Sequence, residues 1–90
     1  MYYVYILNNK LDDKLYIGYT NNLARRIHQH NSGKSLYTKR SKVWALVYFE
    51  GYASQDDAQY REQQLKAYGK VYSQLKRRIR RSLSNQKVRG

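Results

Sequence analysis

The segment YYVYILNNKLDDKLYIGY, residues 2–19, decides how this chain begins to fold. Residues 2–7 and residues 15–19 are two apolar, aromatic and β-branched runs, and residues 8–14 between them are mostly polar. Two such runs separated by a polar stretch are typical of a β-hairpin with a longer loop. The sequence therefore predicts that the chain opens with two antiparallel strands.

The hairpin is expected to place two tyrosines on one face of the sheet. With the loop centred on Lys10 and Leu11, the strands pair so that Tyr5 lies opposite Tyr16, and alternation puts both side chains on the same side. The aliphatic residues that a core requires point to the other side, and these are Val4, Ile6, Leu15 and Ile17. We therefore expect the tyrosines to line something other than the core.

The residues after the hairpin predict a helix and a third strand. Thr20 or Asn21 can accept the first amide bonds of a helix, and an Asn-Ser-Gly triplet ends it. Residues 32–42 show no periodicity and are interpreted as a basic loop. Residues 43–50 are interpreted as the third strand, which Gly51 ends with a turn.

Two more helices are predicted in the remainder of the chain. Ser54 and Asp57 have the spacing of a capping box, which opens a helix that runs to Gly69. A single helix with an apolar seam and a positive outer surface follows it. The inner stripe of the first of these helices is Ala58, Glu62, Leu65 and Tyr68, and the seam of the second is Val71, Leu75, Ile79 and Leu83.

Composition limits the class of protein. Ninety residues support one apolar core and hence one domain, which we place at residues 1–83, with residues 84–90 expected to fray. No cysteine is available for a disulfide or a zinc site, no signal-peptide pattern is present, and the longest apolar stretch, residues 43–49, is too short to span a membrane. We therefore expect a cytoplasmic protein without a membrane partner; the oligomeric state stays open, with a monomer favoured.

Charge indicates the partner. The chain has 18 Lys and Arg against 6 Asp and Glu, a net charge of +12, and no acidic residue follows Glu62. A polyanion such as nucleic acid is the natural partner of such a chain, and the alternative is a solvated basic tail that only keeps the protein soluble. The bases expected to contact nucleic acid are Lys34, Lys39, Arg40 and Lys42 in the loop and Lys76, Arg77, Arg78 and Arg81 in the last helix.

Three residues are candidates for chemistry, and each has a structural alternative. Glu62 falls on the inner stripe of its helix, where a carboxylate is costly unless paired or metal-bound, although an ion pair with Lys66 four residues on would be commonplace. Arg26 borders the buried side of the first helix and can offer a planar fork to a phosphate, although it is also one of 18 bases. His30 can carry a proton or donate to a phosphate, although a histidine near a helix end often serves only that end.

Taken together, these residues match one family pattern. The pattern is Tyr3-Val4-Tyr5, ten residues, Tyr16-Ile17-Gly18, an arginine in the next helix and a glutamate in a later one. In this order and spacing, the chain resembles the GIY-YIG nucleases over about residues 2–75. It is most similar to small bacterial proteins made of this domain alone, and it also resembles the catalytic domains of excision-repair incision subunits, junction-cutting nucleases and homing endonucleases. One departure is Tyr3, which stands where the name-giving glycine should be and leaves the local backbone packing in question.

The resemblance implies a fold and an activity. The fold is α+β, a three-stranded antiparallel sheet flanked by helices in the order β-β-α-β-α-α. The activity is metal-dependent hydrolysis of DNA phosphodiester bonds, in DNA repair or in the processing of structured DNA. The alternatives are a nucleic-acid-binding module with little nuclease activity, for DNA or RNA, and a structural RNA-binding protein of the translation apparatus. A carboxylate that faces a polyanion favours the enzyme over both.

The resemblance also implies roles for the site residues. Glu62 would hold one Mg²⁺ or Mn²⁺, and Arg26 would bind the negative charge that develops at the phosphorus. Tyr5 is the candidate general base, with Tyr16 orienting the attacking water or sharing that role, and His30 assists at a phosphate oxygen. The base role requires the Tyr5 hydroxyl to be far more acidic than its reference pKa near 10.

Overall fold

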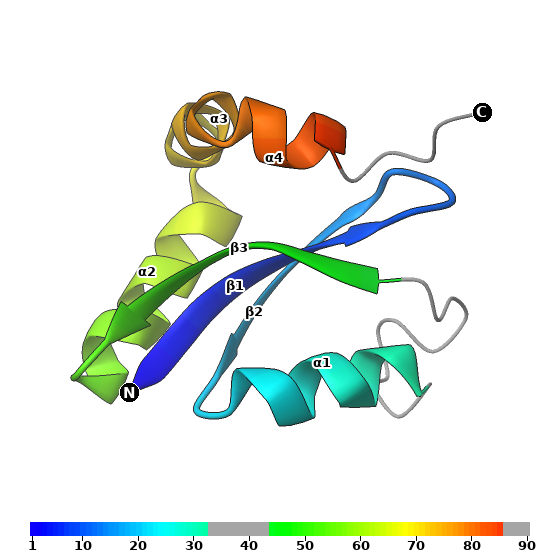
Figure 1. The fold of residues 1–90 in the computed structure, drawn as a ribbon. Helices are drawn as coiled ribbons and strands as arrows, with labels where there is room; N and C mark the ends of the chain where they lie inside the picture. The colour runs from blue at the N-terminus through cyan, green and yellow to red at the C-terminus, as the bar shows by residue number, and fades with distance from the viewer. Residues whose placement is uncertain (33–43, 86–90) are drawn as a thin grey trace.

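The computed structural model of this chain describes residues 1–32 and 44–85. The elements in chain order are β1 (Tyr2–Asn9), β2 (Leu15–Thr20), α1 (Leu23–Asn31), β3 (Trp44–Tyr52), α2 (Gln55–Ala67), α3 (Gly69–Arg78) and α4 (Arg80–Asn85). The three strands form one antiparallel sheet in the order β2-β1-β3, with β1 in the centre (Figure 1). The predicted α+β fold, a three-stranded antiparallel sheet flanked by helices, is therefore confirmed.

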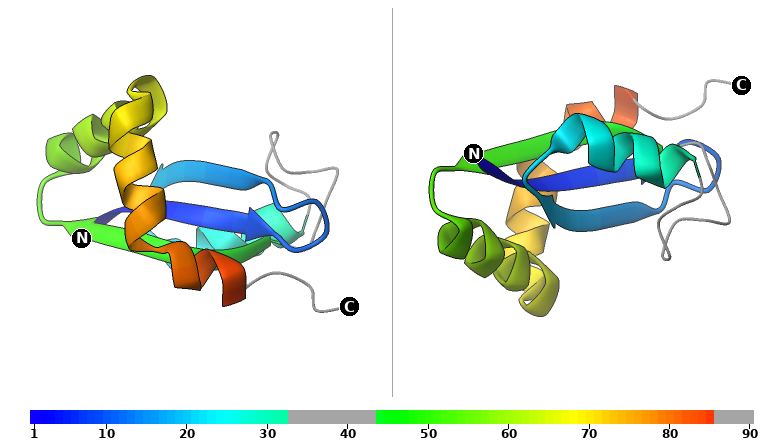
Figure 2. Two further views of the ribbon diagram at one scale, coloured as in Figure 1. Left: turned by 90° about the horizontal axis from the view of Figure 1, so that it is seen from above. Right: turned by 90° about the horizontal axis from the view of Figure 1, so that it is seen from below.

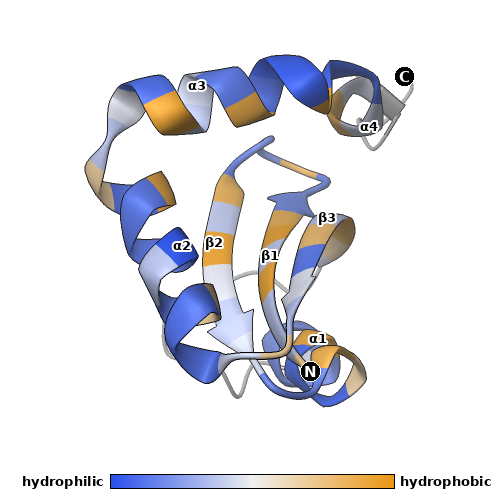
Figure 3. Ribbon diagram, turned by 90° about the vertical axis from the view of Figure 1, so that its left-hand side faces the viewer, coloured by the Kyte–Doolittle hydropathy of each residue, from blue (hydrophilic) through white to orange (hydrophobic). Residues whose placement is uncertain are grey.

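The helices cover the sheet on opposite sides. Seen from above and from below, α3 and α4 lie over one face and α1 lies over the other (Figure 2). Figure 3 shows α2 beside β2, where orange and pale segments alternate along the strand as the two-residue period requires. The main core lies on the face of α3 and consists of Val4, Ile6, Ala58, Leu65, Leu75 and Ile79, with Leu15 and Ile17 packed against it. Each fully buried aliphatic side chain contributes about 1.5–3 kcal/mol.

The hairpin register differs from the predicted one by two residues. Tyr5 pairs with Gly18, and Tyr16 pairs with Leu7, because β1 continues to Asn9 and the loop is centred after Leu11. The Asn9 side chain explains the shift, since its Oδ1 accepts from the backbone N of Leu11 at 2.9 Å and closes the turn locally. A shift of two keeps every side chain on its predicted face, so both tyrosines still share one side of the sheet.

The predicted ends of β3 and α2 were wrong. Gly51 does not turn the chain, because β3 continues to Tyr52 and Gly51 pairs with Tyr3. Ser54 caps α2 as predicted by accepting from the backbone N of Asp57 at 3.3 Å, but the helix ends at Ala67 and Gly69 begins α3. Tyr68, predicted to be on the inner stripe, lies in the joint between the two helices and is 56% exposed.

The C-terminal helix is broken in two, which makes the observed order β-β-α-β-α-α-α. Ile79 leaves the helical region at φ −104° and ψ 22°, and it is buried in the core together with Leu75. No glycine or proline marks this break in the sequence. The second piece, α4, includes Ser84 and Asn85, while residues 86–90 of the expected fraying tail lie outside the described part. Within residues 1–32 and 44–85, no helix is long and apolar enough to cross a membrane.

A partly buried polar cluster fastens α2 to β3. The Glu50 carboxylate accepts from Arg61 Nε at 2.9 Å and from the hydroxyls of Tyr48 and Tyr52. Burial alone would raise the pKa of Glu50, but the hydrogen bonds from Arg61, Tyr48 and Tyr52 hold it below its ordinary value. Burial and the neighbouring carboxylate raise the pKa of both tyrosines to about 12. Glu50 therefore stays ionised and fixes the rotation of the helix that carries Glu62.

Replacing Glu50 with glutamine is expected to lower the free energy of unfolding by roughly 2 kcal/mol at pH 7, because the charged bond to a part-buried arginine is lost. Glu50 has a lowered folded-state pKa, so its stabilisation is present above about pH 4.5 and is lost as the pH falls through the folded value. The difference between wild type and Glu50→Gln should therefore shrink below pH 4.5. Urea unfolding at pH 7 and pH 3.5 measures it; a pH-independent difference would contradict the ionic role.

Candidate active site

Tyr5 and Tyr16 meet on the α1 face of the sheet, where their ring centroids lie 6.2 Å apart. Tyr5 pairs with Gly18 across the strands, and its phenol ring lies directly over that glycine. A Cβ atom on Gly18 would stand 2.3 Å from the Tyr5 hydroxyl oxygen, which no side chain could tolerate. The glycine of the Tyr16-Ile17-Gly18 motif is therefore required for space.

His30, in the last turn of α1, lies inside this tyrosine pair. Its side chain is fully buried, its Nε2 is hydrogen-bonded to the Tyr5 hydroxyl at 2.9 Å, and its ring lies edge-on to Tyr16 with centroids 4.7 Å apart. Burial first, and then the charge of Arg26, lower the pKa of His30 to about 4. His30 is therefore neutral at pH 7, and the observed partner of its Nε2 is Tyr5. The assisting role at a phosphate oxygen that the resemblance implies for His30 stays a prediction.

Arg26 lies one turn earlier on α1 and reaches the same two hydroxyls. Burial tends to lower the pKa of its guanidinium, but hydrogen bonding to Tyr5 and Tyr16 raises it overall. Its Nη1 also donates to Gln29 Oε1 at 2.9 Å, which holds the side chain along the helix. Arg25, the neighbouring residue, is exposed and only approaches Asn21 at 3.5 Å. Arg26 therefore lies on the side of α1 that faces the tyrosines, and Arg25 lies on its exposed side.

The two tyrosines have different surroundings. Tyr5 is 1% exposed, and burial raises its pKa to about 12, more than the hydrogen bond from Arg26 lowers it. This direction is opposite to the acidic hydroxyl that a general base at Tyr5 requires. Tyr16 is only half-buried and borders an open cavity. Of the two hydroxyl groups, that of Tyr16 is the better placed to meet a substrate.

Glu62 completes the cluster from α2. Its side chain is 20% exposed, and its charge contributes to the raised pKa of Tyr5, so the carboxylate lies within electrostatic reach of that hydroxyl. Its Oε2 also forms an ion pair with Lys66 Nζ at 3.1 Å. The alternative that the sequence left open, a pair with Lys66, is therefore present, and Glu62 faces the tyrosine site as well.

The donor set at Glu62 fits a hard divalent cation with few protein ligands. Among residues 1–32 and 44–85, no group of three acidic, histidine or cysteine side chains could enclose a metal ion. Mg²⁺ is commonly held by one or two carboxylates, with water and substrate phosphate oxygens completing the shell. A single carboxylate beside an arginine and two tyrosine hydroxyls is compatible with that mode.

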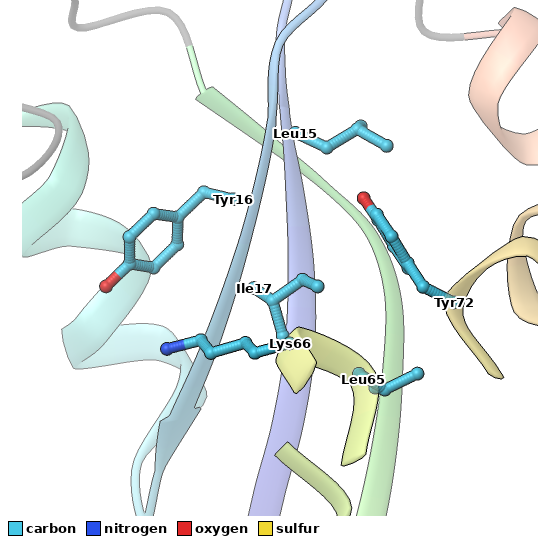
Figure 4. A pocket seen from close by; sticks show the side chains of 6 residues that line it. All are labelled: Leu15, Tyr16, Ile17, Leu65, Lys66 and Tyr72. Carbon is cyan, nitrogen blue, oxygen red and sulfur yellow. The ribbon is translucent and has the colours of Figure 1, made fainter. Parts of the chain in front are cut away.

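A cavity of about 410 Å³ adjoins the site at the β2 edge of the sheet (Figure 4). Figure 4 shows Leu15 and Ile17 pointing toward Leu65 and Tyr72 on one side of β2, while the Tyr16 ring points to the other side. The cavity is thus lined by the apolar side chains Leu15, Ile17 and Leu65 and by three residues with polar ends, Tyr16, Lys66 and Tyr72.

Comparison with known proteins identifies the domain. A family model described as the GIY-YIG catalytic domain matches residues 1–73. The chain belongs to the GIY-YIG family. A UPF0213 protein of Staphylococcus haemolyticus is 43% identical over 70 residues, 77% of this chain and 84% of the relative. A UPF0213 protein of Clostridium perfringens is 48% identical over 67 residues, 73% of this chain and 71% of the relative.

A solved structure of the same group agrees with the fold of this GIY-YIG domain. The solution NMR structure of a UPF0213 protein from Bacillus halodurans is 37% identical and matches with a TM-score of 0.52, over 83% of this chain and 82% of that one. The domain therefore belongs to a nuclease family and resembles small single-domain members of it. The names of these relatives state no activity.

The departure at Tyr3 is accommodated within the GIY-YIG domain. Tyr3 lies on β1 opposite Gly51, and its ring packs edge-on against Phe49 with centroids 5.9 Å apart. A Cβ on Gly51 would stand 3.4 Å from the Tyr3 ring. The Tyr3 ring thus packs against Phe49 and lies in ordinary contact distance of position 51.

The basic residues of the GIY-YIG domain divide into two groups. Four of them, Lys34, Lys39, Arg40 and Lys42, lie outside the described residues. Arg77, Arg78 and Arg81 are exposed on α3 and α4, and Lys76 is half-buried, with its ammonium 4.5 Å from the centre of the Tyr72 ring. The exposed arginines form a basic surface across the top of the sheet, as predicted for the outer side of this segment.

Some supporting residues were not found from the sequence. Gln29, which orients Arg26, follows it at helical i+3 spacing, a signal that was available. Asn31 was interpreted only as a helix stop, yet its side chain donates to and accepts from the backbone of Trp44 at 2.9 and 2.8 Å. These two hydrogen bonds hold the end of α1 against β3. They join residues 13 apart in the chain and could be identified only from the fold.

Proposed function

We propose that this GIY-YIG domain is a divalent-metal-dependent endonuclease that hydrolyses DNA phosphodiester bonds, in repair or in the processing of structured DNA. One observation carries the proposal: Tyr5, Tyr16, Arg26 and Glu62 converge from β1, β2, α1 and α2. Four separate elements supply a cation, an acid and two hydroxyls to one place. Phosphodiester hydrolysis needs such groups to activate water and to stabilise a crowded, negatively charged transition state.

We assign roles from burial and hydrogen bonding. Arg26 binds the phosphate and the charge that develops on it, because its guanidinium is fixed by Gln29 and reaches both hydroxyls. Tyr16, which lines the cavity, orients the attacking water through its hydroxyl. Tyr5, protonated at pH 7, positions the site, and His30 holds the Tyr5 hydroxyl in place. Mg²⁺ or Mn²⁺ on Glu62 would polarise a phosphate oxygen.

The main alternative is a nucleic-acid-binding module with little nuclease activity. The Glu62–Lys66 pair and the raised pKa of Tyr5 would suit such a module. Against it stands the cost of a carboxylate beside a bound polyanion, for which binding alone gives no reason. Cleavage assays with and without Mg²⁺ or Mn²⁺, on duplex, flap, junction and single-stranded DNA and on RNA, distinguish the two. Metal-dependent products from a DNA substrate support the nuclease, and intact substrates throughout would contradict it.

The basic surface of α3 and α4 is expected to contribute affinity without contributing chemistry. Each phosphate contact on duplex DNA steepens the plot of log affinity against log salt by roughly 0.9. Replacing Arg77, Arg80 and Arg81 with glutamine should therefore flatten the slope by about two to three units. Arg78 is left intact because it acts electrostatically on Tyr48. Binding titrations at several salt concentrations measure the slope.

Single-turnover cleavage at saturating protein provides the control for this triple variant. Its rate should change little, because the bound complex still presents phosphate to Tyr16, Arg26 and Glu62. An unchanged salt slope would mean that the surface of α3 and α4 does not contact DNA. The ones to test would then be Lys34, Lys39, Arg40 and Lys42, the other bases predicted to contact nucleic acid.

A further inference from the structure

Lys66 forms an ion pair with Glu62 and also lines the cavity beside β2. Its Nζ lies 3.1 Å from Glu62 Oε2, and its side chain is 52% exposed whereas that of Glu62 is 20% exposed. It lines the same cavity as Tyr16. In Figure 4 the Lys66 ammonium lies on the same side of β2 as the Tyr16 ring.

An ammonium in contact with this carboxylate has consequences for a metal ion. A divalent cation must reach a Glu62 oxygen at about 2.0–2.1 Å to bind directly. A lysine ammonium on the same carboxylate competes for its charge and repels a second cation nearby, by an amount that grows as the surroundings become less polar. The Lys66 ammonium and a divalent cation therefore compete for the Glu62 carboxylate.

We propose that Lys66 is a built-in competitor of the divalent ion at Glu62, which weakens metal binding in the free protein. The inference rests on the proposed metal role of Glu62. Lysine suits this task because its flexible stem lets a compact charge leave the carboxylate without moving the helix. Its half-exposed side chain has room to do so. The domain would then hold little metal until other groups draw the ammonium away or supply further ligands.

A plain surface ion pair makes a different prediction. Pairs at i,i+4 on a helix contribute little to stability, and removing one lysine from a chain of net charge +12 should favour any cation slightly, wherever that lysine lies. Lys10, exposed in the loop between β1 and β2, offers the matched loss of charge away from Glu62. Comparing the two lysines separates a local effect from a general one.

The experiment is Mn²⁺ binding to the purified full chain without nucleic acid, followed by electron paramagnetic resonance of the free ion. Lys66→Met and Lys66→Gln should bind Mn²⁺ about three- to tenfold more tightly than wild type, from the pairwise charge effects expected at a partly exposed site. Lys66→Arg, which keeps a cation beside Glu62, should stay near wild type. Lys10→Met should change the affinity by less than about twofold, since exposed distant charges are screened.

Glu62→Gln separates failure of this inference from failure of the proposed function. One outcome would overturn only the inference that Lys66 competes with the metal ion. In that outcome Glu62→Gln loses Mn²⁺ binding, but Lys66→Met binds Mn²⁺ no more tightly than Lys10→Met does. Equal Mn²⁺ binding by wild type and Glu62→Gln would remove the metal assignment itself, whatever Lys66 does. Absence of Mn²⁺ binding in every variant, Lys66→Met included, would contradict both.

Discussion

Replacing Glu62 with glutamine is expected to abolish divalent-metal-dependent DNA cleavage while the fold stays intact. Glutamine keeps the size and shape of the side chain but lacks the charge that a hard cation requires. Stability should change by less than about 1 kcal/mol, because the ion pair lost is with Lys66, which is half-exposed. Single-turnover cleavage with Mg²⁺ or Mn²⁺ measures the first effect, and thermal unfolding measures the second.

Asp56→Asn is the matched control for Glu62→Gln. Asp56 lies in the first turn of the same helix and is exposed, so the substitution removes the same charge from α2 outside the site. It should cleave at close to the wild-type rate. A Glu62→Gln protein that cut DNA as fast as wild type would show that the carboxylate has no part in the reaction.

The face of the sheet on which the tyrosines lie could be predicted because successive side chains of a strand alternate between its two faces. A register error of an even number of residues therefore leaves each side chain on the same face. The predicted loop centre was wrong by one residue, yet the resulting two-residue shift in pairing left Tyr5 and Tyr16 on the correct face. The centre itself depended on Asn9, whose side chain closes the loop through two backbone amides. Hydrogen bonds of this kind compete with the strand ladder and are not visible in a hydrophobic pattern.

Helix spacing predicted the buried positions of α2 and failed where the helix stopped. Ala58 and Leu65 are buried and Glu62 is nearly so, as the stripe requires, but Tyr68 lies beyond the last helical residue and is exposed. Gly69 is only a weak signal for the break between α2 and α3, because glycine is common both at helix ends and in loops. The break at Ile79 had no local signal.

The electrostatic state of the site depends on packing between segments distant in the chain. Tyr5 and His30 are 25 residues apart, and each loses water only when α1 closes over the sheet. The resulting pKa values, about 12 for Tyr5 and about 4 for His30, reverse the expectation of an acidic tyrosine. Residue types and spacing singled out residues that lie together in the fold, whereas their protonation states could be judged only from the fold.

Replacing Arg26 with alanine is expected to slow single-turnover cleavage roughly a hundredfold to a thousandfold, the usual effect of losing a donor to transition-state charge. Arg26 is the cation of α1 that reaches the hydroxyls of Tyr5 and Tyr16, and Gln29 holds it there. A guanidinium that is already held in position stabilises the transition state more than one that must be ordered during the reaction. The measurement is the cleavage rate at saturating protein, which removes any difference in DNA affinity.

Arg25→Ala provides the comparison, because it removes the same side chain from the same helix one residue away. Arg25 is exposed and lies on the outer side, near Asn21, so its loss should weaken DNA binding and leave the saturated rate within a few-fold of wild type. Thermal unfolding of both variants checks that α1 is still in place, since Asn31 and His30 anchor it independently of either arginine. Equal and small rate effects for the two variants would mean that the transition-state charge is balanced elsewhere, and that the contact of Arg26 with the tyrosines is only structural.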